Sequence, residues 1–198
     1  MNLVDRVKAI LLTPRKEWPV IDAEPATISS LYSSYVLPLA AIPPIASFIG
    51  WSLIGETFFG TTIRLSITQG IESALVRYIL SLASVYVLAL IIDALAPNFD
   101  GQKSQIQAFK IAAYSSTAAW VAGIFMVVPA LGILAILGLY SLYLLYLGLP
   151  VLMKSPQDKA AGYTVVVIVC AIVLYLIVGV IVLRVVPIPI GTSTITAP

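Results

Sequence analysis

The sequence predicts an all-α polytopic membrane protein, with five transmembrane helices preceded by a short N-terminal interfacial helix. Apolar residues make up 60% of the 198 residues and charged residues only 10%. A soluble domain carries about 25% charged residues. The mean hydropathy is +1.04. Such a chain cannot cover its surface with water-compatible groups, so we expect it to lie in a bilayer.

Five segments are long and apolar enough to span a membrane, which takes about 20 residues at a rise of about 1.5 Å each. They form a predicted bundle over residues 31–185, and lie at about 31–54, 74–96, 111–128, 131–149 and 163–183. The third and fourth segments together hold enough residues to cross the membrane twice. A tight turn at Val128-Pro129-Ala130 is therefore expected between them.

Residues 1–30 form a predicted cytoplasmic arm with an amphipathic helix. Its apolar residues recur at helical spacing, at Leu3, Val7, Ile10 and Leu11. Asn2 can cap the start of this helix, and Pro14 ends it. We expect the helix to lie in the membrane interface, followed by Trp18 at the depth that indole rings prefer. A helix packed over the end of the bundle and a partner-binding helix are the alternatives.

The distribution of Lys and Arg predicts the orientation. Eight of them fall on one side, at Arg6, Lys8, Arg15, Lys16, Lys103, Lys110, Lys154 and Lys159, and three on the other, at Arg64, Arg77 and Arg184. Because cytoplasmic loops carry the excess of positive charge, the N-terminus is predicted in the cytoplasm and a flexible tail, 186–198, outside. The first apolar stretch begins too late for a cleaved signal peptide.

Several function classes are excluded by composition. Histidine is absent and there is a single cysteine, which rules out Ser-His-Asp and Cys-His catalysis, zinc sites with His ligands and an internal disulfide. No basic stripe is present to neutralise nucleic-acid phosphates, and no glycine-rich phosphate loop or metal-ligand cluster occurs. We therefore expect no enzyme, cofactor, metal or nucleic-acid partner.

Three prolines, Pro38, Pro43 and Pro44, lie in the first predicted span. Each removes a backbone donor and clashes with the carbonyl four residues earlier. The helix is therefore predicted to kink or break near its middle, and the freed carbonyls need partners inside the bundle. Broken helices line substrate sites in transporters, but they also occur as plain kinks.

Asp93 lies near the cytoplasmic end of the second span. An ionisable group at the membrane edge is a functional candidate. We expect an ion pair with Lys110 or Lys103, and a proton or cation site is the alternative. On the other side of the membrane, a pairing of Glu72 or Glu56 with Arg77 would let the arginine lie slightly inside the bilayer.

The third span is rich in small residues, which let helix backbones approach closely. Two rows spaced by four carry them, Ala108, Ala112 and Ser116, and Ser115, Ala119 and Gly123. This span is predicted at the centre of the bundle, although the same rows would also serve a homo-oligomer contact. Tyr140 in the fourth span is too deep for the aromatic belt, so its hydroxyl should bond a neighbouring helix.

Several stretches resemble the Yip family of five-span membrane proteins, in particular its bacterial branch. They are TPRKEWPVI, YVLPLAAIPPIASFIG, DALAPNFDG, AAYSSTAAWVAGIFMVVPALG and LYSLYLLYLGLPVLMKSPQDKAAGYT, and they cover almost the whole chain. The resemblance implies a bacterial cytoplasmic (inner) membrane location. Eukaryotic relatives contact prenylated Rab-type GTPases, but their Asp-Leu-Tyr-Gly-Pro stretch is replaced here by YSSYVLP at 32–38, which argues against that role.

These observations favour a non-catalytic membrane protein that organises protein partners or lipids at the cytoplasmic face. The arm and the loops at 97–107 and 154–162 would make the contacts. The alternative is a transporter or channel for a small solute or ion, in which the broken first span faces the third and Asp93 lies near the gate. A continuous polar cavity bordered by the three prolines together with Asp93, Tyr114 or Ser115 would favour transport.

Overall fold

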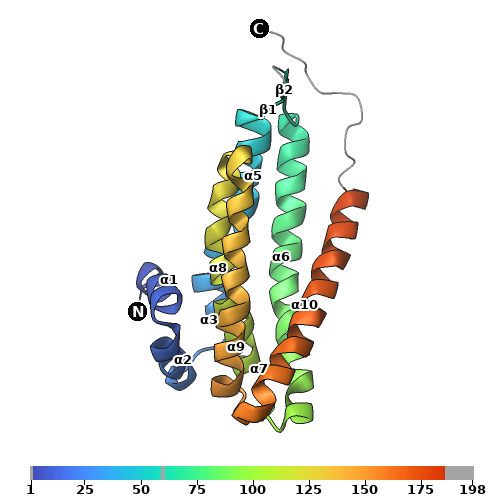
Figure 1. The fold of residues 1–198 in the computed structure, drawn as a ribbon. Helices are drawn as coiled ribbons and strands as arrows, with labels where there is room; N and C mark the ends of the chain where they lie inside the picture. Colours follow the sequence, from blue (N-terminus) through green and yellow to red (C-terminus); the bar gives the residue numbers. More distant parts are fainter. Residues whose placement is uncertain (1, 59–60, 186–198) are drawn as a thin grey trace.

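The chain forms a bundle of five helical spans with a helical hairpin against its flank, in a computed structural model that describes residues 2–58 and 61–185 (Figure 1). The spans are Ile28–Ile54, Ile67–Phe99, Gln105–Val127, Pro129–Leu152 and Gln157–Val185, all long and apolar enough to cross a membrane. Each predicted segment overlaps one of them. The predicted tail, 186–198, lies outside the described residues. The predicted all-α membrane architecture is confirmed.

A short β-hairpin between the first two spans was not predicted. Strand β1, Glu56–Phe58, pairs antiparallel with β2, Thr61–Ile63, with Thr57 opposite Thr62. The β-hairpin lies at the upper end of the bundle in Figure 1, whereas the two N-terminal helices lie against its flank nearer the lower end.

The N-terminal arm contains two helices, α1 (Leu3–Leu12) and α2 (Pro14–Ala23). The predicted cap is confirmed, because the Asp5 N–H donates to Asn2 Oδ1 at 2.8 Å. Pro14 ends α1 as predicted, but it also starts α2 at the first helical position, where its missing N–H costs nothing. The second helix was missed because proline was considered only as a terminator.

The first span is broken, as the prolines predict. It runs through α3 (Ile28–Leu31), a π-helical turn (Tyr32–Val36), α4 (Leu37–Ala40), α5 (Ile42–Phe48) and a second π-helical turn (Ile49–Ile54). Pro38 lies in the first turn of α4, and Pro43 and Pro44 lie in the first turn of α5. A proline is best tolerated in the first turn of a helix, because an N–H there has no partner within that same helix.

Two carbonyls at the break have new hydrogen-bond partners. Pro43 cannot donate to the Leu39 carbonyl, which accepts instead from the Ala41 N–H. The Leu37 carbonyl, left without that N–H, accepts from the Tyr78 hydroxyl of the second span at 3.0 Å. The second span therefore completes the hydrogen bonding of the first.

The other spans are more regular. Their elements are α6 (Ile67–Leu95) with a 3-10 turn (Ala96–Phe99), α7 (Gln105–Ser115), α8 (Thr117–Ala122) with a 3-10 turn (Gly123–Val127), a 3-10 segment (Pro129–Leu139) followed by α9 (Tyr140–Leu152), and α10 (Gln157–Val185). Val128 is extended, with φ −112° and ψ 108°. The predicted turn between the third and fourth spans is therefore confirmed.

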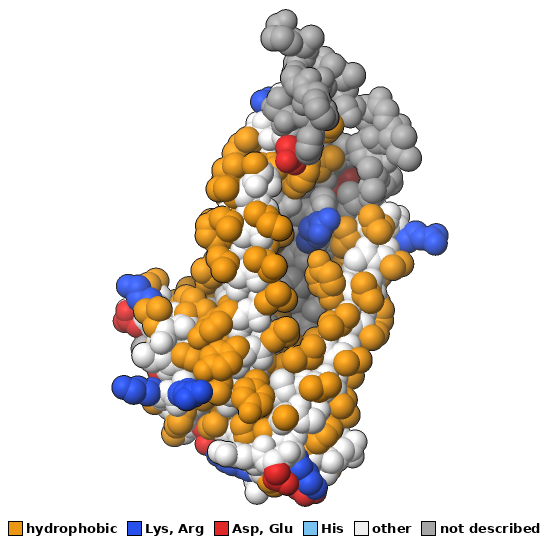
Figure 2. All heavy atoms as spheres, viewed as in Figure 1, with side chains coloured by type: hydrophobic (Ala, Val, Ile, Leu, Met, Phe, Trp, Pro, Cys, Tyr) orange, Lys and Arg blue, Asp and Glu red, His pale blue; other side chains and the backbone are white. Residues whose placement is uncertain are grey.

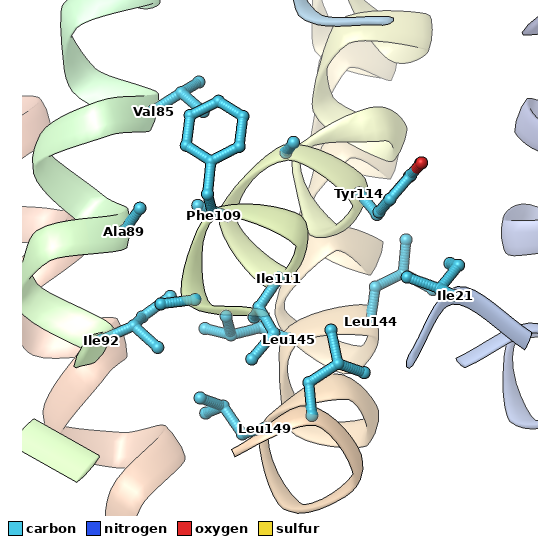
Figure 3. Close-up of a cluster of buried hydrophobic side chains, with 14 of the residues drawn as sticks. Ile21, Val85, Ala89, Ile92, Phe109, Ile111, Tyr114, Leu144, Leu145 and Leu149 are labelled. Carbon is cyan, nitrogen blue, oxygen red and sulfur yellow. The ribbon is translucent and has the colours of Figure 1, made fainter. Parts of the chain in front are cut away.

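The third span lies at the centre of the bundle, as its small residues predict. It is the most buried of the five spans, and all eight residues from Ala108 to Ser115 are buried. In Figure 3, Phe109 and Ile111 lie between side chains of α6 and of α9. The outer face of the bundle is mostly apolar (Figure 2), as a lipid-facing surface requires.

Replacing Tyr78 by Phe should destabilise the fold, because the Leu37 carbonyl would lose its donor where lipid offers none. We expect a loss of about 0.6–2 kcal/mol, measured as a lower midpoint of thermal unfolding followed by tryptophan fluorescence in detergent. Tyr146→Phe is the matched control, since the Tyr146 hydroxyl makes no hydrogen bond with the described residues. Equal midpoints for the two variants would contradict the assigned role.

Candidate functional site

The helices α1 and α2 form the N-terminal hairpin, which is called the hairpin below. Buried ionisable groups gather at the junction between this hairpin and the bundle. Arg6 on α1 is 5% exposed and Glu17 on α2 is 7% exposed. The Arg6 guanidinium forms ion pairs with Glu17 and Glu24 and lies 5.7 Å from the centre of the Tyr114 ring. Buried charges are expensive unless they are paired. This cluster is therefore the strongest candidate for a functional site in the described chain.

The charge on Arg6 is held in place by its neighbours. Burial acts against it, but the hydrogen bond with Glu24 and the nearby carboxylates of Glu24 and Glu17 outweigh burial, so the pKa of Arg6 lies above its usual value. Lys110 lies close enough for its charge to interact with those of Arg6 and Glu24. Asp22 also acts on Lys110, so three carboxylates and two cations share the junction.

Lys110 reaches from α7 to the end of α2. Its ammonium group donates to the Ile21 carbonyl at 2.8 Å and to the Glu24 carbonyl at 2.6 Å. The last carbonyls of a helix have no intrahelical partner and carry partial negative charge. Lys110 therefore caps α2 from another part of the chain, which fixes the hairpin to the third span.

Trp18 is fully buried beneath the hairpin. Its ring lies edge-on to Tyr114, with 6.5 Å between the ring centres. The opposing position on α9 is Gly148, where a Cβ atom would come within 2.8 Å of Trp18 Cζ2. Trp18 is therefore packed inside the fold, because a glycine on the fourth span opens a place for the indole, and its predicted depth in the membrane interface stays a prediction.

Three polar groups beside the cluster form a hydrogen-bonded chain. Thr117 Oγ1 donates to the Tyr114 carbonyl at 2.7 Å, so its 2.7 Å contact with Tyr35 uses the tyrosine as donor. A cavity of about 230 Å³ adjoins them and is lined by Asn2, Leu3, Arg6, Glu24, Pro25, Ser34, Tyr35 and Tyr114. The candidate Tyr114 thus belongs to the hairpin junction.

The predicted ion pair of Asp93 is not formed. Neither Lys103 nor Lys110 pairs with Asp93, and its buried Oδ1 has no hydrogen-bond partner in the described chain. The physical reason is that Lys110 is turned toward the carbonyls of the hairpin. Near Asp93, the Tyr163 hydroxyl donates to the Ile92 carbonyl.

Two other candidates have structural partners. Ser115 Oγ donates to the Ile111 carbonyl one turn earlier at 2.6 Å. The Tyr140 hydroxyl donates to the Leu11 carbonyl at 3.1 Å, which joins α9 to α1. The prediction that Tyr140 bonds a neighbouring helix is confirmed.

The prolines lie away from this junction. Pro43 and Pro44 border a second cavity, whereas Pro38 does not line it. Asp93, Tyr114 and Ser115 do not line it either. The predicted transport cavity was to be bordered by all three prolines together with Asp93, Tyr114 or Ser115. The observed cavity is bordered by two of the prolines and by none of these three polar residues.

The pairing expected for Arg77 is also absent. Arg77 Nε donates to Ser73 Oγ at 3.2 Å, and neither Glu56 nor Glu72 forms an ion pair with it. Residues five apart point about 140° away from each other around a helix. Glu72 therefore faces away from the side that Arg77 occupies.

The junction is built to hold the hairpin. Its cations are paired with carboxylates or hydrogen-bonded to carbonyls, and the Thr117 hydroxyl donates to a backbone carbonyl. Within residues 2–58 and 61–185, no three His, Cys, Asp or Glu side chains lie close enough to hold a metal ion. Sequence reasoning missed Arg6, Glu17 and Glu24, because alternating charges on a short helix look like a solvated face.

Comparison with known proteins gives a consistent result. Residues 8–181 match the Yip1 domain family. The chain is 35% identical over 123 residues to the inner membrane protein YohC of Escherichia coli strain K12, and to the protein of that name in E. coli O6:H1 strain CFT073. The alignment covers 62% of this chain and only 63% of each relative. No solved structure matches.

Removing the buried cation should release the hairpin. In Arg6→Met, Glu17 is left buried and unpaired, which costs about 3–5 kcal/mol. We expect trypsin to cleave the arm after Lys8, Arg15 and Lys16 much faster than in the parent protein.

Lys159→Met is the control, because Lys159 pairs with Asp100 away from the hairpin. Equal cleavage of the arm in the two variants would show that Arg6 does not hold it.

Proposed function

Because the chain belongs to the Yip1 domain family of integral membrane proteins, we propose that it is a non-catalytic scaffold that organises protein partners or lipids at the cytoplasmic face. The relatives named as inner membrane proteins support the same location for this chain. Most of the Lys and Arg residues lie in the N-terminal arm and in the loops after the second and fourth spans, which supports a cytoplasmic N-terminus.

The observation that carries this proposal is the way the hairpin is joined to the loops. Asp22 at the end of α2 forms an ion pair with Lys154, which follows the fourth span, and accepts from Gln107 Nε2 at 3.0 Å. The hairpin, the start of the third span and the loop after the fourth are therefore held as one surface.

The two loops are also held together. Lys159 forms an ion pair with Asp100, and the Gln102 N–H donates to the Met153 carbonyl at 2.7 Å. The loop after the second span is thereby fixed beside the loop after the fourth. A surface with this many internal ties can present several contacts to a partner without first having to order itself.

The outer face of the hairpin combines apolar and basic side chains. Val4, Lys8 and Leu12 are exposed along one row of α1, and Arg15 and Lys16 are exposed at the start of α2. Such a face fits a partner that is partly apolar and negatively charged, either an acidic protein surface or anionic lipid headgroups. Homo-oligomer contacts through other faces stay a prediction.

Transport is the alternative function, and it would require a polar path past the broken first span. Because Asp93 does not line the cavity that Pro43 and Pro44 border, we expect no flux of protons, common cations or anions above that of empty liposomes. Flux in the parent protein that is lost in Asp93→Asn or Pro43→Ala would overturn the scaffold proposal.

A photo-crosslinking side chain at Leu12 and another at Lys103 would test the scaffold directly in bacterial membranes. We expect both positions to capture the same partner, because the hairpin and the loop form one surface. Arg6→Met should abolish capture at Leu12 by releasing the hairpin.

The matched control position is Val173, an exposed apolar residue on α10. Two results would contradict a specific partner surface at the hairpin. One is capture of the same partner from Val173, and the other is capture at Leu12 that is unchanged by Arg6→Met.

A further inference from the structure

A cavity of about 380 Å³ lies between α5, α6, α8 and α10 and shares no lining residue with the cavity at the hairpin junction. In Figure 1, α6 and α10 diverge toward the upper end, which carries the β-hairpin, and Figure 2 shows this face hollowed between the bundle and α10. The volume falls in the range of small-ligand pockets, about 300–1,000 Å³. Its walls are mainly apolar.

Arg77 lies on the wall of this cavity without a counter-charge. Its only hydrogen bond within the described residues goes from Nε to Ser73 Oγ, so the rest of the guanidinium is free to bind another group. A cation in a membrane span is costly unless it is paired. Arg77 is exposed at the surface of the chain, whereas the buried cations Arg6 and Lys110 are paired with protein groups.

The position of Arg77 along α6 matches the edge of the hydrocarbon. Helix α6 has 29 residues, or about 43 Å, which exceeds the hydrocarbon core of about 30 Å. Arg77 is about 15 Å from the start of the helix. A centred helix places its Cα some 8 Å inside the hydrocarbon edge, and a long side chain can extend back toward the headgroups.

Polar groups continue from Arg77 toward the membrane surface. A small cavity of about 10 Å³ adjoins the main one and shares Arg77, Pro44 and Ser47 with it. Ser52 also lines the small cavity, and its buried Oγ has no hydrogen-bond partner in the described chain. A ligand at this place is therefore offered a cation and unused hydroxyls at one end.

The opposite wall leaves space for an apolar chain. Gly179 on α10 borders the main cavity, and no atom lies within 4 Å of where its Cβ would be. Leu88 and Val182 also line the cavity. The site thus has Arg77 at one end and a mainly apolar lining, with Ser81, Ser84 and Ser116 among the apolar side chains.

We propose that this cavity binds an anionic phospholipid from the bilayer, with the phosphate on Arg77 and an acyl chain between α6 and α10. A guanidinium binds phosphate with two parallel hydrogen bonds, which supplies the charge partner that the chain itself does not. Amphipathic shape and charge together select a lipid over a soluble ion. This proposal does not depend on the scaffold function.

Native mass spectrometry of the full chain in detergent, titrated with phosphatidylglycerol or phosphatidylcholine, would test it. We expect tighter binding of phosphatidylglycerol. Arg77→Gln should weaken that binding about tenfold, because a charge-assisted contact is lost, and should remove the preference between the two lipids. Arg77→Lys should retain part of it. Gly179→Leu should weaken both lipids by filling the space for the chain.

Two matched controls separate the site from general effects. Arg184→Gln removes another arginine, at the end of α10, and Gly132→Leu adds a side chain where open space also exists but outside the cavity. Both should bind lipid as the parent does, and thermal unfolding should show that all variants are folded. Unchanged binding in Arg77→Gln, an equal loss in Arg184→Gln, or displacement of the lipid by inorganic phosphate would overturn the proposal.

Discussion

Hydrocarbon offers no hydrogen-bond partner, and this constraint decides how the first span can break. The Leu37 carbonyl is rescued by the Tyr78 hydroxyl from the second span. Tyr32 donates in the same way to the Leu82 carbonyl, at 2.8 Å. These two bonds run in opposite directions between the same pair of spans. The broken helix is therefore held by its neighbour, and the break has a fixed geometry instead of acting as a loose joint.

The same constraint applies to the charges of the hairpin junction. Arg6 is paired with carboxylates, while Lys110 is paired with carbonyls at the end of α2. The second arrangement is possible only when α2 has formed and docked, because those carbonyls are otherwise scattered along an unfolded arm. Docking of the hairpin and burial of Lys110 therefore stabilise each other, which makes the arm part of the bundle despite its position before the first span.

Features that depend only on residues close together in the sequence could be predicted. The Asn2 cap, the break at the prolines and the turn at Val128 each follow from short-range sterics and hydrogen bonding. The partners of charged residues could not be predicted in this way. Lys110 bonds residues more than 80 positions away, and a sequence shows only that a buried cation needs a partner. Lys110, Tyr114 and Tyr140 were recognised as unusual, but their common relation to the hairpin became visible only in the fold.

The two halves of the molecule satisfy their charges by different means. In the half beside the hairpin, Arg6, Lys110 and Lys154 all have protein partners. In the other half, Arg77 has only a serine one turn away and borders an open cavity. A bundle that needed Arg77 only for packing would tolerate an apolar residue there at lower electrostatic cost. In the proposed arrangement the bilayer supplies the counter-charge that this half of the chain does not.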